Sequence, residues 1–479
     1  MKKFCKVDLA LGLLCFLIGL ICLIILLFPY IREMVFHFFK SLAPRELTDA
    51  EESMINKAFI IFPVTGLLLS IIVGALILFE ESIIAAMTQN IFYLSYFAVS
   101  LAAFIIRLPG MQFLSSDYIT FIKPWISFLT TNNHLFGINS ISSNYTPFYL
   151  FILGFISYLP ESLWLISVKL TSCLFDFFLA IICGKIVLLI TGRKERALVA
   201  YSAILLCPTV FMNSSIWAQC DSIYVCFMFL SLLLFIKGRN NLALFMYGIA
   251  LSIKLQAIFM FPFVLILYLY NRFKIRNICF LVLGFISSPI IGFPFGAPKQ
   301  FIKAFSWQLI SYSDFLTSTT SVYALFHIED EFIPLITNLG IILTIGFLIC
   351  FVLYILYNRN DYVRRKENPD ISFEKTRFVI LFFFFTLIIP FLLPKMHVRY
   401  FFAAEIASII YAVLFPGKWW IALLIILPGC ATYFIYLFAN TANLSSLAII
   451  MLFGVLLVTR WTIDNIRMTS AIYGDNKKN

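Results

Sequence analysis

The feature of this sequence that most restricts its fold is a succession of long apolar runs, each close to the roughly 20 residues that a helix needs to cross a bilayer. Only 12% of the residues are charged and 62% are hydrophobic, whereas soluble domains carry about 25% charged residues. We therefore expect an all-α polytopic membrane protein, with residues 1–479 as a single integral membrane domain. About 14 transmembrane helices are expected, at residues 8–30, 56–79, 88–106, 164–190, 197–212, 221–236, 240–256, 257–271, 278–295, 332–357, 378–393, 400–415, 419–437 and 445–459.

The charged segments between these runs predict the orientation, because Lys and Arg gather on the cytoplasmic side of membrane proteins. The start "MKKFCKVDLA" precedes an apolar run that is too long for a signal peptide and lacks an A-x-A site, so we expect an uncleaved first span with a cytoplasmic N-terminus. The expected cytoplasmic segments are then basic and include residues 191–196, 237–241, 271–277 and 358–377. This orientation places roughly 22 of the 35 Lys and Arg residues inside.

One apolar stretch, "TPFYLFILGFISYLP" at residues 146–160, does not fit this pattern. It is too short for a span and is bounded by two prolines, and if it crossed the membrane the basic segment 191–196 would lie outside. We expect an interfacial helix on the outer face instead. Residues 107–163 then become one long extracytoplasmic loop, and loops of this length inside a compact protein are usually functional.

The ionisable residues next to the expected spans gather on the outer face. Such residues are costly near a membrane and indicate function by default. They lie in the long loop and in three outer turns: Asp117, Asp221, Lys254, His397 and Arg399. Carboxylates and cations on one face suit a reaction that needs a base and an anion-binding group.

Each residue also has a structural alternative. Asp117 could be a solvated loop acid, and Asp221 could cap the helix that begins near residue 222. Lys254 could extend to lipid headgroups and Arg399 could anchor a helix end. Two tryptophans could belong to an aromatic belt at the membrane surface: Trp125 and Trp217.

Cysteine and histidine do not indicate a metal site. The 11 Cys include no CxxC pair and the four His are scattered, so buried structural thiols are expected. We expect no cofactor, although a divalent ion between Asp117 and Asp221 stays open as an alternative. The net charge of +11 is spread along the chain, so no nucleic-acid partner is expected.

Six segments in order resemble the bacterial membrane glycosyltransferases of the GT-C superfamily, and in particular the GPI mannosyltransferase II-like group. The resemblance extends over about residues 107–411, and the combination of W-x-Q-x-D-S-I-Y with K-x-Q-A is its most specific part. Residues 1–90 and those after 415 carry no motif. The matching segments are "SSDYITFIKPW", "SNYTPFYLFIL", "KLTSCLFDFFLAIICGKIV", "NSSIWAQCDSIY", "GIALSIKLQAIFMFPF" and "PKMHVRYFFAAEI".

The resemblance implies sugar transfer on the extracytoplasmic face of a bacterial inner membrane. The donor would be a sugar on a polyprenyl phosphate, and the acceptor a glycan, a lipid or a protein. A catalytic acid in the first long outer loop maps onto Asp117. The chain departs from its relatives at three positions, which usually hold glycine, an acid and a second proline: Ala218, Val398 and Phe148.

Displacing polyprenyl phosphate from a sugar carbon needs a base for the acceptor hydroxyl and cations for the leaving phosphate. We assign Asp117 as the base, with Asp221 as the alternative, and expect inversion at the anomeric carbon. Lys254 and Arg399 are the first candidates for the phosphate, and Arg107 and Lys123 the second. Expected substrate-binding residues are Trp125, Asn144, Tyr145, Trp217, Gln219, Gln256, His397 and Tyr400.

The alternative function is a transporter or flippase of lipid-linked saccharides. Such proteins often contain internal repeats and ionisable residues at the midplane of the membrane. No repeat is visible in this sequence, and the acids lie at the outer rim of the expected spans. These two observations favour the transferase.

Overall fold

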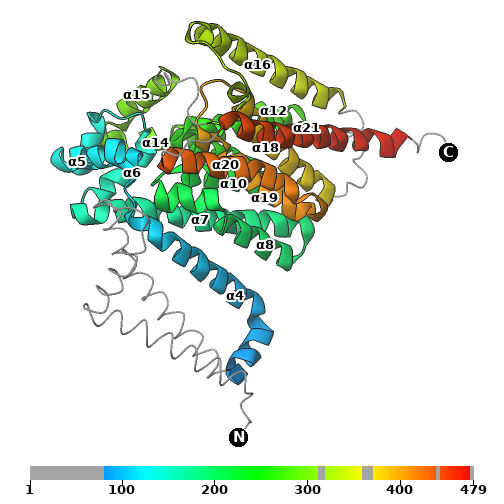
Figure 1. The fold of residues 1–479 in the computed structure, drawn as a ribbon, viewed down its shortest axis with the longest axis horizontal. Helices are drawn as coiled ribbons and strands as arrows, with labels where there is room; N and C mark the ends of the chain where they lie inside the picture. The colour runs from blue at the N-terminus through cyan, green and yellow to red at the C-terminus, as the bar shows by residue number, and fades with distance from the viewer. Residues whose placement is uncertain (1–79, 311–318, 359–370, 439–442, 475–479) are drawn as a thin grey trace. The chain divides into compact units, whose positions relative to one another are not determined.

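The computed structural model describes residues 80–310, 319–358, 371–438 and 443–474 (Figure 1). Within these ranges every regular element is helical, which confirms the all-α prediction. The helices divide into two compact units, residues 1–110 and 111–479. The expected spans 8–30 and 56–79 lie outside the described residues.

The described part of the first unit is the helix α4 (Glu80–Arg107), which bends at Asn90. Its apolar part agrees with the expected span 88–106. At its end, the guanidinium of Arg107 donates a hydrogen bond to the carbonyl of Ala103 at 2.9 Å.

The second unit contains long helices that form a bundle and short helices that join them. Proline in the first turn begins α5, α6, α9, α12 and α16, where its missing N–H costs no helical hydrogen bond. The helices are α5 (Lys123–Thr131), α6 (Pro147–Ile156), α7 (Glu161–Thr191), α8 (Lys194–Leu205), α9 (Pro208–Phe211), α10 (Asp221–Ile236), α11 (Asn240–Ile253), α12 (Phe261–Leu269), α13 (Ile278–Phe285), α14 (Ser287–Ile291), α15 (Ala297–Ile310), α16 (Ile333–Tyr357), α18 (Ile371–Leu392), α19 (Phe402–Leu414), α20 (Trp420–Phe438) and α21 (Leu444–Gly474).

Six described helices are long and apolar enough to cross a membrane, and the bent pair of α8 with residues 208–216 makes a seventh candidate. The expected number of about 14 spans is not shown by these residues. Several expected spans are instead shorter helices, including α10, α11 and α13. For α11 the reason is visible at Lys254, whose extended backbone (φ −152°, ψ 133°) separates this helix from the following 3-10 helix η5 (Leu255–Met260).

The helix α10 lies in the centre of the bundle. It is apolar along nearly its whole length and almost all its side chains are buried, as expected for a helix that is surrounded by others. It packs on α7, α11 and α18. Because α10 and α11 are consecutive, antiparallel helices, Asp221 at the start of α10 and Lys254 after α11 lie at the same end of the bundle.

Two glycines allow α11 and α13 to approach closely. A Cβ atom on Gly248 would collide with the backbone of Leu281 and Phe285, and a Cβ atom on Gly284 would collide with the carbonyl of Phe245. Small residues at such crossings let helix backbones come into contact. The α11–α13 pair therefore depends on the absence of side chains at both positions.

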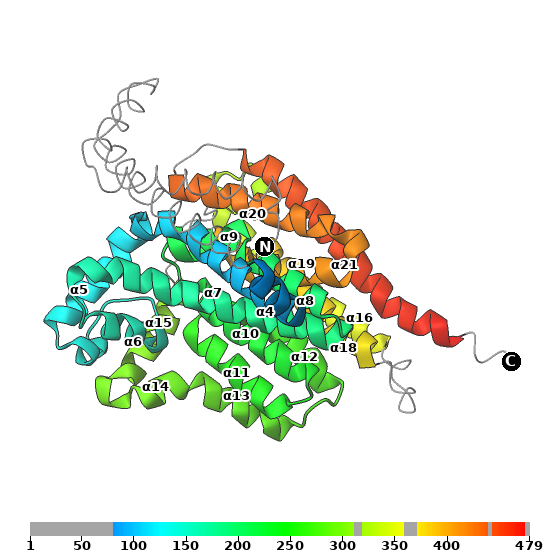
Figure 2. The same cartoon turned by 90° about the horizontal axis from the view of Figure 1, so that it is seen from below.

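Short helices cover one end of the second unit. Figures 1 and 2 show α5, α6, α14 and α15 gathered there, and contacts between these helices hold the group together. The ten-residue helix α6 is about 15 Å long, too short to cross a bilayer, as predicted for residues 146–160. The expected loop 107–163 is therefore largely helical. Of the expected loop 358–377, residues from Ile371 onward belong to α18, and residues 359–370 lie outside the described residues.

Candidate active site

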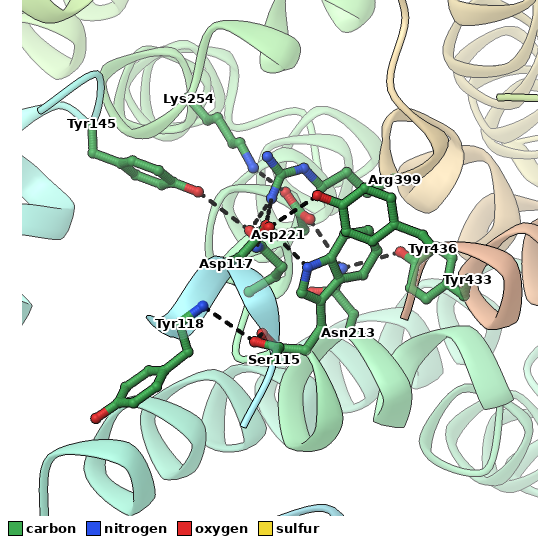
Figure 3. A network of polar contacts seen from close by, with 12 residues as sticks. Ser115, Asp117, Tyr118, Tyr145, Asn213, Asp221, Lys254, Arg399, Tyr433 and Tyr436 are labelled. Atoms are coloured by element: carbon green, nitrogen blue, oxygen red, sulfur yellow. Dashed lines mark hydrogen bonds and ion pairs between the residues drawn. The ribbon is translucent and has the colours of Figure 1, made fainter. Parts of the chain in front are cut away.

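The stretch "SSDY" is fixed to the segment before α10. The Ser115 hydroxyl donates to the carbonyl of Trp217 at 2.7 Å and accepts the backbone N–H of Tyr118 at 3.3 Å (Figure 3). Asp117 lies between them, directly before the π-helical turn η2 (Tyr118–Ile122). The backbone of the long expected loop is thus held against residues that are about a hundred positions away.

Four side chains converge on the carboxylate of Asp117. The Trp217 indole and the Gln219 amide donate to its Oδ2 at 3.0 and 2.5 Å. The Tyr436 hydroxyl donates to Oδ1 at 3.0 Å, and a guanidinium nitrogen of Arg399 lies 3.7 Å from Oδ2. Asp117 is only 9% exposed, so it is not a solvated loop acid.

Ala218 has a positive φ of 65°, in the left-handed region that favours glycine. This turn allows its neighbours Trp217 and Gln219 to reach the same carboxylate oxygen. The glycine that relatives usually carry at this position is therefore what the backbone conformation predicts.

The second carboxylate, Asp221, is buried in an ion pair with Lys254. The Asn213 amide also donates to Asp221 at 3.0 Å, and to the Tyr433 hydroxyl at the same distance. α10 begins at Asp221 itself and has no side-chain cap, so the helix-cap alternative is wrong. Lys254 is 5% exposed and does not extend to lipid headgroups.

The "NYTPF" segment is brought beside Lys254 by one hydrogen bond. The Thr146 hydroxyl donates to the carbonyl of Ile253 at 2.9 Å, the last residue of α11. The neighbouring Tyr145 ring lies 5.8 Å from the Lys254 amine, and its hydroxyl donates to Gln219 at 3.3 Å. Burial raises the pKa of Tyr145 well above its usual value, which keeps this hydroxyl protonated as a donor.

Arg399 links the two halves of the cluster. Its guanidinium donates to the side-chain oxygen of Gln219 and lies 5.7 Å from the Trp217 ring. Gln219 therefore connects Arg399 with Asp117, because its amide nitrogen donates to Asp117 while its amide oxygen accepts from Arg399 as well as from Tyr145. Arg399 is 8% exposed, so it belongs to the cluster and does not serve as a membrane anchor.

His397 and Val398 cover the other side of Trp217. The His397 ring lies 5.6 Å from Trp217 and 6.0 Å from Tyr400. Burial, together with the positive charges of Arg399 and Lys254, lowers the pKa of His397 well below its usual value. Val398 packs in an apolar cluster with Trp217 and Tyr433, so the position that often holds an acid in relatives is part of the core here.

Three other predicted residues lie beside the cluster. Trp125 is 5.3 Å from the Tyr145 ring, and its indole donates to the carbonyl of Ser142 at 3.1 Å. It is 9% exposed and Trp217 is fully buried, which excludes an aromatic belt for both. Asn144 precedes Tyr145, and Gln256 follows Lys254 by two residues. Among the described residues, the buried side-chain oxygen of Gln256 has no hydrogen-bond donor.

One predicted cation of the second unit lies outside the cluster. Lys123 forms an exposed ion pair with Glu161 at 2.8 Å, on the outside of α5. Arg107 belongs to the first unit, where it contacts the carbonyl of Ala103, and its role in phosphate binding stays a prediction.

The sequence did not identify Tyr433 and Tyr436, although both take part in the network. They are three residues apart on α20, so they share one helix face. This spacing is the one feature of the sequence that could have indicated a common role for the two tyrosines. The residues after 415 carry no motif, and Tyr436 is 319 positions from Asp117. Only the folded chain brings them together.

Asp176 is a second functional candidate that the sequence did not single out. This fully buried acid of α7 accepts the Ser214 hydroxyl at 2.6 Å and also the Ser222 hydroxyl. Asp176 therefore holds Ser214 and Ser222, which lie on either side of Trp217, Gln219 and Asp221 in the chain. An acid inside an apolar helix indicates function. In the sequence, Asp176 was counted as part of an apolar span and was not considered separately.

Within the described residues, no group of three or more His, Cys, Asp and Glu is arranged to hold a metal. The oxygens of Asp117 and Asp221 instead accept hydrogen bonds from protein side chains. The expectation that the enzyme needs no cofactor stays a prediction.

Residues 144–368 match the family model of glycosyltransferase family 87. The protein is a glycosyltransferase. The match includes Tyr145, Trp217, Gln219, Asp221 and Lys254, and supports a GT-C enzyme, without confirming the GPI mannosyltransferase II-like group. Together with the long apolar helices, it indicates an integral membrane glycosyltransferase. In a comparison with curated proteins, none matched.

Proposed function

We propose that this glycosyltransferase moves a sugar from a polyprenyl-phosphate donor to an acceptor hydroxyl, with Asp117 as the general base. The observation that carries the proposal is the position of the Asp117 carboxylate 3.7 Å from the guanidinium of Arg399. A base and a phosphate-binding cation are thus adjacent in one fixed network.

Asp117 is a better base than Asp221 because of its surroundings. The Asp221 side chain has no exposed surface and is paired with Lys254, so no acceptor reaches it. The Asp117 side chain is 12% exposed. A general base must come within about 2.6–3.2 Å of the proton it removes, and that access exists only at Asp117.

The proposed step is a single displacement. The acceptor hydroxyl gives its proton to Asp117 while its oxygen forms a bond to the anomeric carbon. The bond from that carbon to the phosphate oxygen breaks, and polyprenyl phosphate leaves with the electron pair. Arg399 stabilises the leaving phosphate through its planar donors, and Lys254 adds positive charge nearby. Attack from the face opposite the phosphate inverts the configuration.

The network also supports a role for the aromatic side chains. Flat aromatic faces adjoin the Asp117–Arg399 pair. The Trp217 ring lies 5.7 Å from Arg399, Tyr145 donates to Gln219, and Trp125 packs on Tyr145 at 5.3 Å. Such faces suit a sugar ring or a lipid tail. Asn144, Gln219, Gln256, His397 and Tyr400 are proposed to bind substrate hydroxyls.

A transfer assay tests the donor class. Membranes that contain the enzyme are supplied with a labelled sugar, either on polyprenyl phosphate or on a nucleotide, and label in extractable glycan, lipid and protein is measured. We expect incorporation from the polyprenyl phosphate donor alone. Incorporation only from the nucleotide sugar would contradict the proposed donor. Movement of the intact lipid-linked sugar across the membrane without transfer would favour the flippase alternative.

We also propose that the site faces the extracytoplasmic side of a bacterial inner membrane. The basic segments 237–241 and 271–277 lie at the opposite end of α10 and α11 from Asp221 and Lys254, which supports this orientation. In a variant without the native cysteines, Glu161→Cys should react with an impermeant thiol reagent from outside intact cells, and Arg193→Cys should not. The reverse labelling pattern would place the site in the cytoplasm.

A further inference from the structure

The end of the bundle that lies away from Asp117 contains a second polar site. The loop after α10 with the start of α11, and the loop after α12, line an open cavity of about 530 Å³. Asp221 and Lys254 lie at the other ends of α10 and α11. The 16 residues of α10 separate the cavity from Asp221 by about 24 Å. It is therefore distinct from the candidate active site.

We call this cavity the basic pocket. Its lining carries four cations and no acid among the residues that the structure describes. The residues are Gly238, Arg239, Asn240, Asn241, Leu242, Asn271, Arg272, Phe273, Lys274, Arg276 and Asn277. The carboxamides of four Asn supply further donors. Such a lining attracts an anion with several acceptor oxygens.

Hydrogen bonds between the two loops give the basic pocket a defined shape. The Asn240 amide donates to the carbonyl of Arg272 at 2.6 Å, and the Asn277 amide donates to Asn241. Phe273 is buried and its ring stacks on Phe235 at 6.2 Å. The loops are thus held together and anchored to the end of α10.

The four cations differ in their surroundings. Arg272 is paired with Glu374 of α18 and so forms one wall. Arg239, Lys274 and Arg276 are exposed, and no ion pair links them to another described residue. Their charges remain available to a ligand.

Exposed apolar side chains stand beside these cations. Leu242, in the first turn of α11, is 41% exposed, and Ile275, after α12, is 63% exposed. Apolar and cationic side chains side by side are typical of surfaces that bind the headgroup region of an anionic membrane. The combination fits a phosphate group that is attached to a lipid.

We propose that the basic pocket binds a phosphate group, as carried by an anionic phospholipid headgroup or by free phosphate. A bound phosphate would join the loop after α10 to the loop after α12. It would thereby fix the end of the helix pair that carries Asp221 and Lys254. This site is independent of the sugar-transfer proposal.

The test measures binding to the purified, detergent-solubilised full-length protein. The probes are a short-chain phosphatidylglycerol, a short-chain phosphatidylcholine and inorganic phosphate, and the readout is the melting temperature as a function of probe concentration. The pocket variant is Arg239→Gln/Arg276→Gln. The control variant is Arg193→Gln/Lys194→Gln, which removes the same charge from the exposed start of α8, outside the basic pocket. The preceding end of α7 lies at the same end of the bundle, because Lys375 contacts the Leu189 carbonyl next to the Glu374–Arg272 pair.

We expect saturable stabilisation of the natural sequence by phosphatidylglycerol, and binding about tenfold weaker in the pocket variant. The control variant should bind as the natural sequence does.

Stabilisation by inorganic phosphate as well would show that the phosphate group alone suffices. Stabilisation by phosphatidylglycerol without any effect of inorganic phosphate would show that the ligand is the lipid. Equal binding in the pocket and control variants would overturn the proposal. So would equal stabilisation by phosphatidylcholine, or no saturable effect of phosphatidylglycerol or inorganic phosphate. Melting of both variants without probe shows whether each is folded.

Discussion

At the scale of single residues, Ala218 determines where two donors of the site point. Its left-handed backbone (φ 65°) turns Trp217 and Gln219 toward the same oxygen of Asp117. An L-residue in this region costs roughly 1–2 kcal/mol, and a β-branched residue is a genuine outlier there. The site therefore includes a strained position that glycine would relieve.

This conformation predicts opposite results for two substitutions. Ala218→Gly should keep the rate of sugar transfer within about twofold, because glycine adopts the same φ without strain. Ala218→Val should lower the rate by about tenfold or more, because its side chain opposes the turn and displaces Trp217 and Gln219. Transfer is measured in membranes at matched protein level. A fully active Ala218→Val enzyme would show that the turn does not position the donors.

The pH dependence of stability is a second consequence at this scale. The pKa of His397 is lowered by burial and by two nearby cations, so the folded protein holds the neutral ring. Above the unfolded pKa of about 6.5 the ring is neutral in both states, and the full stability is present. Below it only the unfolded state takes up the proton, so stability falls as the pH falls.

We therefore expect the melting temperature of the detergent-solubilised protein to decrease as the pH is lowered from about 7.5 to about 5.5. His397→Gln cannot take up this proton and should show a smaller decrease over the same interval. The comparison uses the slope of melting temperature against pH, since the substitution also changes packing. Parallel slopes for the two proteins would mean that His397 does not cause the acid sensitivity.

At the scale of helices, the α11–α13 contact tests whether the bundle packs as described. Alanine at Gly284 would place a methyl group against the carbonyl of Phe245, and overpacking of this kind costs about 1–3 kcal/mol. Gly346 in α16 has open space at the same position and serves as the control. There, alanine removes the unfavourable helix propensity of glycine, about 1 kcal/mol.

Gly284→Ala should therefore lower the melting temperature, while Gly346→Ala should leave it unchanged or raise it slightly. Both are measured by thermal unfolding in detergent. A loss of stability in both variants would indicate a general sensitivity of glycine positions. An unchanged Gly284→Ala protein would mean that α11 and α13 are further apart than the structure shows.

At the scale of the whole molecule, the sequence predicts composition-driven features well and tertiary ones poorly. Apolar runs predict α7, α16, α18, α20 and α21 because each run is long enough and apolar enough to span a membrane. They fail near Lys254, where one extended residue breaks the helix and hydropathy alone does not register the break.

The candidate site divides in the same way. Asp117, Gln219, Asp221, Lys254 and Arg399 were identifiable because polar residues beside apolar runs are costly and therefore conspicuous. Tyr436 was not, because a tyrosine near the end of a span is ordinary and its contact with Asp117 joins helices that are distant in the chain. The assignment of Lys123 to the phosphate stays a prediction: Lys123 is near Asp117 in the sequence, but its side chain forms an exposed ion pair with Glu161.

The central claim is that Asp117 takes the proton from the acceptor, and one comparison tests it directly. Sugar transfer from a polyprenyl-phosphate donor is measured for Asp117→Asn and Asp221→Asn in membranes, with protein level and melting temperature checked. Asn keeps the shape of Asp but is a very poor base, so Asp117→Asn should remain folded and lose about 10²-fold or more of the transfer rate. Asp221→Asn should lose its pairing with Lys254 and show a lower melting temperature. Near-normal transfer by a folded Asp117→Asn enzyme would contradict the account.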